Sequence, residues 1–162
     1  MYKSLKNKQN NCERNDKMND KNELLEYIYQ TTDLGKKGLI HLLQALENKD
    51  NKIKKDIEKQ LEGYEELHNK TKELLKENKT KPKDKGPFIE MMNKMGVNMN
   101  VMMDNSDSKV AEIIIQGLTM GIIEMEKQIK EYEDEVDKEV LKLAKQVLKF
   151  QEKCLENIKK YL

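Results

Sequence analysis

Two side chains with metal-ligand chemistry stand three residues apart in a segment with helical periodicity. They are Glu65 and His68, which share a helix face because residues three or four apart are neighbours on its surface. Di-metal carboxylate sites in helical bundles use such a Glu-x-x-His pair on two helices, with an inward Glu on each of the other two. The pair therefore predicts a candidate metal site, with Glu26 and Glu124 as candidate further ligands.

The other ligands that such a site requires are mostly missing. Hard metal ions prefer oxygen ligands, above all carboxylates. The expected inward positions elsewhere carry other residue types: Thr31, Gly35, Gly117, Gly121, Gln151 and Cys154. A competing interpretation is that His68 is a hydrogen-bonded core histidine.

A second group of side chains with specific chemistry is a methionine cluster. Six of the ten methionines lie between Met91 and Met103, and four of them fit one helical face: Met92, Met95, Met99 and Met102. Thioethers bind Cu(I), flexible methionine faces bind protein partners, and methionine also fills irregular gaps in a core. All three interpretations remain open, and the four residues are the candidate partner-binding face.

No motif predicts an enzyme. The sequence has no nucleophile beside a recognisable base motif and no phosphate-binding glycine loop. Gly35-Lys-Lys-Gly38 resembles the backbone clamp of KH modules, which require strands that this chain does not predict. Asp104 could begin a calcium loop, but Lys109 replaces the required Gly and Ile115 the closing Glu. We expect a helix cap there.

The composition indicates one cytoplasmic domain. The chain has 162 residues, of which 38% are charged and 36% hydrophobic, as in long helices with charged outer faces. The net charge of +1 creates no field that would attract nucleic acid or lipid. Cys12 and Cys154 lack metal-like spacing, so we expect free thiols in a reducing cytoplasm. No apolar run reaches the ~18 to 20 residues of a membrane span.

Apolar periodicity predicts four helices after a polar tail. Residues 1–21 are rich in Lys, Asn and Asp, so we expect them to be disordered. Residues 22–162 form the single predicted domain. Its apolar residues recur three and four apart in four segments: 23–47, 53–78, 110–132 and 140–162.

The connections suggest how these helices are arranged. The first two are joined by a short turn, as are the last two, so each pair should be antiparallel. About thirty residues separate the pairs, enough to return along a helix of ~25 residues at ~1.5 Å per residue. We predict an all-α four-helix bundle with a ferritin-like up-down order and a long crossover containing a short Met-rich helix. Gly35, Gly38, Gly117 and Gly121 fall on expected buried stripes, where they would admit a close helix or a large side chain.

The stretch Ala111–Ile122, together with Gly35 and the Glu-x-x-His pair, resembles an uncharacterised group of small bacterial ferritin-like helical proteins. The likeness spans residues 23–162. It implies a four-helix bundle with a crossover and carries no established activity.

From these features we expect a non-catalytic bundle that acts through protein–protein contacts, in particular self-association through the methionine face. The alternative is a ferritin-like metal-binding protein whose degenerate di-metal site uses Glu65 and His68. Apart from that candidate metal ion, we expect no cofactor and no nucleic-acid partner.

Overall fold

The computed structural model describes residues 2–82 and 104–162, with side chains described from residue 23 onward. It contains four α-helices, α1 (Tyr2–Ala45), α2 (Lys54–Glu77), α4 (Asp107–Tyr132) and α5 (Lys138–Ile158), and a final 3-10 turn, η1 (Lys159–Tyr161). All regular elements of the described chain are helical, which confirms the predicted all-α class.

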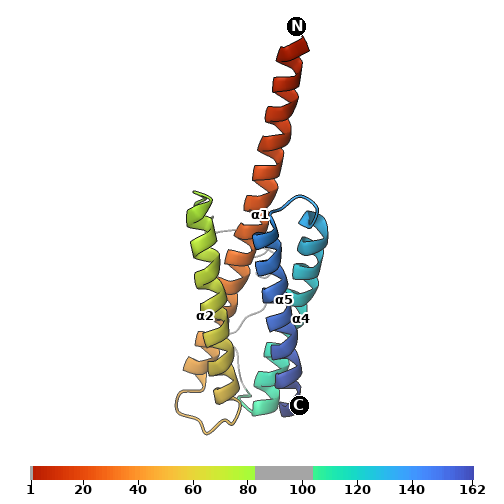
Figure 1. Cartoon of the computed structure of the whole chain (residues 1–162). Helices are drawn as coiled ribbons and strands as arrows, with labels where there is room; N and C mark the ends of the chain where they lie inside the picture. Colours follow the sequence, from red (N-terminus) through yellow and green to blue (C-terminus); the bar gives the residue numbers. More distant parts are fainter. Residues whose placement is uncertain (1, 83–103) are drawn as a thin grey trace.

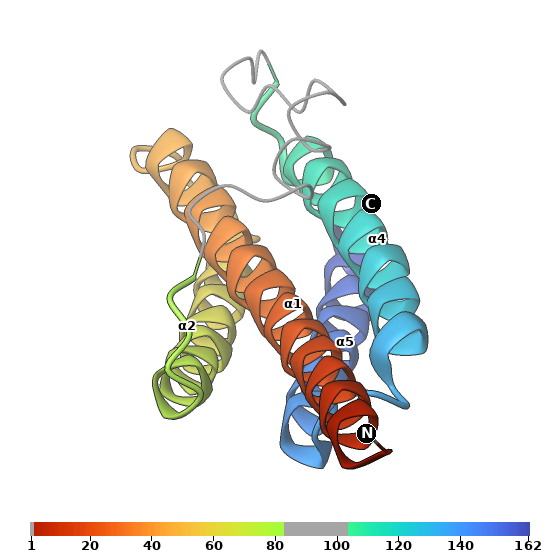
Figure 2. The same ribbon diagram turned by 90° about the horizontal axis from the view of Figure 1, so that it is seen from above.

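The helices form two antiparallel pairs. α1 packs mainly on α2, and α4 packs mainly on α5, as Figures 1 and 2 show. The start of α4 lies beside the start of α2, because Asn51 Nδ2 donates to an Asp107 carboxylate oxygen at 2.8 Å and the Lys52 N–H donates to the other at 3.1 Å. α2 and α4 therefore run in the same direction (Figure 1).

The first helix is longer than the sequence suggested. α1 has 44 residues against 24 for α2, and its first part extends beyond the other helices in Figure 1. It runs through residues 2–21, where we expected a disordered tail. Since no side chain before residue 23 is described, that expectation stays a prediction. The predicted Met-rich helix, with Met92, Met95, Met99 and Met102, lies outside the described residues.

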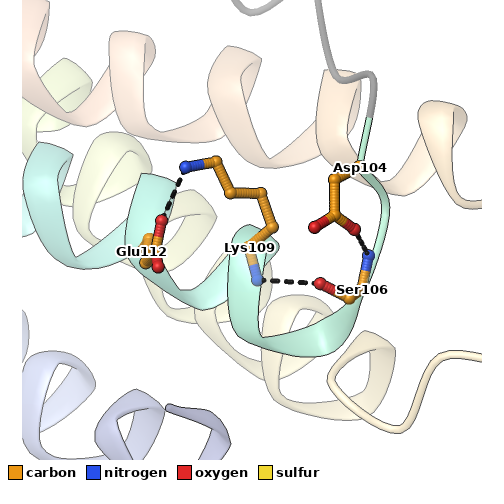
Figure 3. Close-up of polar contacts among 4 residues, drawn as sticks. All are labelled: Asp104, Ser106, Lys109 and Glu112. Carbon is orange, nitrogen blue, oxygen red and sulfur yellow. Dashed lines mark hydrogen bonds and ion pairs between the residues drawn. The ribbon is translucent and has the colours of Figure 1, made fainter.

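α4 begins at a side-chain cap within the stretch where the sequence predicted one. The Ser106 hydroxyl accepts from the Lys109 N–H at 3.3 Å, and the Asp104 carboxylate accepts from the Ser106 N–H at 2.8 Å (Figure 3). The Lys109 ammonium lies 2.6 Å from the Glu112 carboxylate. Asp104 thus orders the cap, since it satisfies a backbone donor just before the helix.

The apolar stripes pack into two clusters, one toward each end of the bundle. One cluster is centred on Leu24, Ile28, Met125, Val140 and Val147. The other is centred on Leu42, Leu46, Ile57, Val110 and Ile158. Most residues predicted to be buried are buried, because a 3.6-residue period keeps them on one side of each helix. Two residues of the predicted segments are exceptions. Gly117 is exposed, and Leu162, the last residue of the segment 140–162, follows the last helical turn and is 67% exposed.

Two glycines of the predicted stripes make room for large neighbours. A methyl group added to Gly35 would lie 2.7 Å from the Tyr64 ring, and one added to Gly121 would lie 2.8 Å from Gln151 Nε2. Gly63, which sequence reasoning did not single out, lies under the Phe150 ring in the same way. The wider side chains across from these glycines occupy the space that a Cβ would take.

Candidate functional site: a buried polar layer and an uncharged helix face

The structure separates the two residues of the candidate metal site. His68 is only 4% exposed, whereas Glu65 is exposed to solvent. The buried stripe of α2 runs through Tyr64, His68 and Thr71. Glu65 follows Tyr64 by one residue, a rotation of about 100°, and this carries it past the edge of the stripe.

His68 is held by groups of α1. Its Nδ1 lies 3.0 Å from Thr32 Oγ1, and the Thr32 hydroxyl is itself 2.8 Å from the Ile28 carbonyl. Because a hydroxyl has one proton, which here goes to the carbonyl, the Thr32 oxygen accepts from a protonated Nδ1. The Tyr29 ring lies against the imidazole with 4.6 Å between centroids. Burial, aided by the nearby Lys36 ammonium, lowers the pKa of His68, so the ring is neutral at neutral pH.

The other proposed ligands do not complete a metal site. Glu26 and Glu124 are half-buried, and the Glu124 carboxylate pairs with the Lys127 ammonium at 2.6 Å. Over residues 23–82 and 104–162, no three His, Cys, Asp or Glu side chains come together where they could hold a metal ion. These residues therefore lack the clustered donors that hard metals require.

Among the apolar residues of both clusters, the core contains uncharged polar side chains. Gln151 Nε2 donates to the Tyr64 hydroxyl at 3.3 Å, and the Tyr64 ring meets the Phe150 ring edge-on with 4.9 Å between centroids. Burial raises the pKa of the Tyr27 phenol and of the Tyr64 phenol. This buried polar layer therefore stays neutral across the physiological range.

Two glutamines of this layer have unsatisfied amide atoms. Gln60 is 5% exposed, and within the described chain neither its Nε2 nor its Oε1 has a hydrogen-bond partner. Gln151 Oε1 is also buried and has no hydrogen-bond partner among the described residues. A buried polar group left unsatisfied costs ~1 to 3 kcal/mol, so the Gln60 amide destabilises the core in this arrangement.

The polar layer offers little reactivity. Cys154 is a free, buried thiol, and burial raises its pKa to about 12. The thiol is therefore protonated at neutral pH and a poor nucleophile. His68 Nδ1 is already used as a hydrogen-bond donor. The layer can position helices but holds no activated nucleophile among the described side chains.

The most unusual surface lies on α4. Residues 113–123 contain no charged side chain, although 38% of the chain is charged. Ile123 is 46% exposed, Ile113 and Met120 are half-buried, and no atom lies within 4 Å of where a Cβ of Gly117 would be. These four residues face one side of α4, and we call them the α4 face. The other large exposed hydrophobic residues that the structure describes, Ile40 and Leu162, lie on α1 and at the carboxyl terminus.

Sequence reasoning missed the α4 face, although a signal was present. The eleven uncharged residues between Glu112 and Glu124 are visible in the sequence. An apolar helix of this kind is expected to be buried on all sides. Only the structure shows that one side is not.

Comparison of the chain with protein-family models, with curated proteins and with solved structures found no match. In the part of the chain that the structure describes, no helix has an apolar stretch long enough to cross a lipid bilayer.

Proposed function

We propose that this chain is a non-catalytic helical bundle that acts through protein–protein contacts, with self-association as their simplest form. The α4 face is the observation that carries the proposal. Burial of one large aliphatic side chain stabilises a contact by ~1.5 to 3 kcal/mol. The α4 face offers three such side chains, Ile123, Ile113 and Met120, and the ion pair of Glu124 with Lys127 lies at its end.

The chemistry of the core supports a non-catalytic role. The two groups with the most reactive side chains, His68 and Cys154, are a buried neutral imidazole and a buried protonated thiol. The free thiol is also in keeping with a reducing, cytoplasmic location. The exposed position of Glu65 weakens the metal-binding alternative, and no described contact favours it.

The proposal includes a ferritin-like topology. Its support is the parallel course of α2 and α4, which puts the end of α2 and the start of α4 at opposite ends of the bundle. Bundles with one long crossover have this order. We propose that residues 83–103 supply that crossover.

Sedimentation velocity over a range of concentrations tests the function. The unmodified chain should associate reversibly, and Ile123→Lys should shift it toward monomer because a charge in an apolar contact must be desolvated. Gln44→Lys is the matched control, since it adds the same charge at an exposed position on α1. A chain that is monomeric at every concentration, or an Ile123→Lys variant that associates as well as Gln44→Lys, would refute self-association.

A further inference from the structure

Two exposed stripes of opposite charge run along α2 and α5. In each stripe the successive residues are four, seven and four positions apart, so they share one face of their helix. The acidic stripe on α2 comprises Glu62, Glu66, Glu73 and Glu77, and the basic stripe on α5 comprises Lys138, Lys142, Lys149 and Lys153. In the described chain only one of these residues forms an ion pair: Glu66, with Lys70 of its own helix at 2.6 Å.

Both stripes lie beside the line along which α2 packs on α5. The Phe150 ring of α5 lies over Gly63 of α2 and occupies the space that a Cβ would take. Glu66 is three residues from Gly63, and Lys153 is three residues from Phe150. Residues three apart are neighbours on a helix surface, so each stripe adjoins this contact. The two stripes therefore belong to the same side of the bundle.

The stripes also match in height along the bundle. Gln151 Nε2 donates to the Tyr64 hydroxyl at 3.3 Å, which fixes the register of the antiparallel helices α5 and α2. Each glutamate is as far from Tyr64 as one lysine is from Gln151, in the opposite direction along the sequence. The level pairs are Glu62 with Lys153, Glu66 with Lys149, Glu73 with Lys142 and Glu77 with Lys138. This side of the bundle thus carries an acidic and a basic stripe of equal length, side by side.

We propose that this side of the bundle binds a second copy of the chain, with α2 of each copy on α5 of the other. A two-fold axis parallel to the helices brings the acidic stripe of each copy opposite the basic stripe of its partner. Rotation about such an axis leaves heights unchanged, so every level pair of the single chain becomes a pair between copies. The contact is the same on both sides and closed, so it ends at a dimer.

Pairing within one chain is the competing use of these charges. Asp56 of α2 and Lys160 of α5 do pair across the line of contact, at 2.6 Å. Among the described residues no such pair joins the acidic stripe to the basic stripe, and all eight side chains are exposed. The stripes therefore keep their charges available to a partner.

The area of this side is close to what a dimer needs. The shorter helix, α5, has 21 residues and is ~32 Å long, and two helices of ~10 Å diameter cover a strip ~20 Å wide. The footprint of ~640 Å² approaches the ~800 Å² per partner of a standard interface. Each exposed ion pair contributes little and is screened by salt, so the dimer should be weak, reversible and salt-sensitive.

This contact goes beyond the proposed function, because it uses α2 and α5 instead of the α4 face. The two contacts respond differently to salt. The Debye length falls from ~10 Å at ~0.1 M to ~3 Å at ~1 M ionic strength, which weakens a contact between exposed charges. An apolar contact such as that of the α4 face has no charges to screen.

Sedimentation velocity of the full chain tests the contact, in an Ile123→Lys background that disrupts the α4 face. The background chain should dimerise at ~0.1 M salt and dissociate at ~1 M salt. Glu73→Lys alone and Lys142→Glu alone should each weaken the dimer roughly tenfold or more, since each opposes like charges at two places. An equimolar mixture of the two variants should dimerise again, because only the mixed dimer has opposite charges at both places. Glu65→Lys is the matched control: it makes the same charge change on α2, about 100° from the acidic stripe.

Recovery in the mixture separates a contact between copies from one within a chain, which mixing does not restore. The proposal is overturned by a background chain that stays monomeric at ~0.1 M salt, by a Glu73→Lys variant that dimerises as well as Glu65→Lys, or by a mixture that stays monomeric. Circular dichroism melts of all variants should match that of the background, since every substituted side chain is exposed. The two proposals fail separately: association that Ile123→Lys abolishes and salt leaves unchanged supports the α4 face and overturns this contact.

Discussion

Replacing Gln60 by Met should stabilise the protein. Gln60 is 5% exposed, and both of its amide atoms lack a hydrogen-bond partner in the described chain. Methionine has a similar length and shape, fits irregular cores and has almost the same helix propensity. The substitution therefore removes an unsatisfied amide at little steric cost, and the free energy of unfolding should rise by ~1 to 3 kcal/mol.

Urea unfolding followed by circular dichroism measures this change. The midpoint should increase with an unchanged slope, since the surface exposed on unfolding stays the same. The melting temperature should rise by roughly 2 to 12 °C for a domain of this size. Gln44→Met is the control, because Gln44 is exposed on α1 and its amide is solvated in both states. If Gln60→Met instead lowers the unfolding free energy by ~1 kcal/mol or more, the native amide is hydrogen-bonded, and the reasoning fails.

Three further measurements address other parts of the core. The contribution of His68 to the free energy of unfolding should reach its maximum above pH ~6.5, the pKa of a histidine in the unfolded chain. It should decrease as the pH falls through the lowered pKa of folded His68, and His68→Gln should remove that part of the pH dependence in urea titrations. Gly35→Ala should lower the free energy of unfolding by ~1 to 3 kcal/mol, because the added methyl group would lie 2.7 Å from the Tyr64 ring. Gly117→Ala should raise it by ~1 kcal/mol, because the space beside Gly117 is open and alanine favours a helix. Equal effects of the two substitutions would contradict the packing. Cys154, with a pKa of about 12, should react with a thiol reagent at pH 8 only after urea unfolds a variant that lacks the other cysteine; fast labelling of the native chain would show that the thiol is accessible.

The fold class could be predicted from the sequence because the apolar residues keep one period over each helix. The stripe of α5 is the clearest case, since seven residues of the predicted segment 140–162, from Val140 to Ile158, form one buried side of the helix. The cap at Ser106 was predictable for a similar reason, because it depends on residues adjacent in sequence. Such local signals carry no information on which helices lie side by side.

The candidate site was harder to predict because a step of one residue turns a side chain by about 100° around the helix axis, which decides whether it is buried or exposed. Glu65 and His68 satisfy an i, i+3 spacing, yet the centre of the buried stripe decides which of them points inward. In α2 that stripe passes through Tyr64 and His68, and Glu65 falls outside it. Gly117 was misplaced for the same reason: it belongs to the apolar stretch of α4, but the core lies on the side of Leu118 and Gly121.

The absence of charge over residues 113–123 is better explained by contact than by core packing. Core packing requires apolar residues on the side of Val110, Ile114, Gly121 and Met125 only, and the other helices carry charged residues on their outer sides. Exposed Lys or Glu residues at Gly117 or Ile123 would cost the isolated bundle almost nothing, since surface substitutions change stability by less than ~0.5 kcal/mol. An uncharged outer side is what the proposed protein–protein contact requires, since a charge there would have to be desolvated.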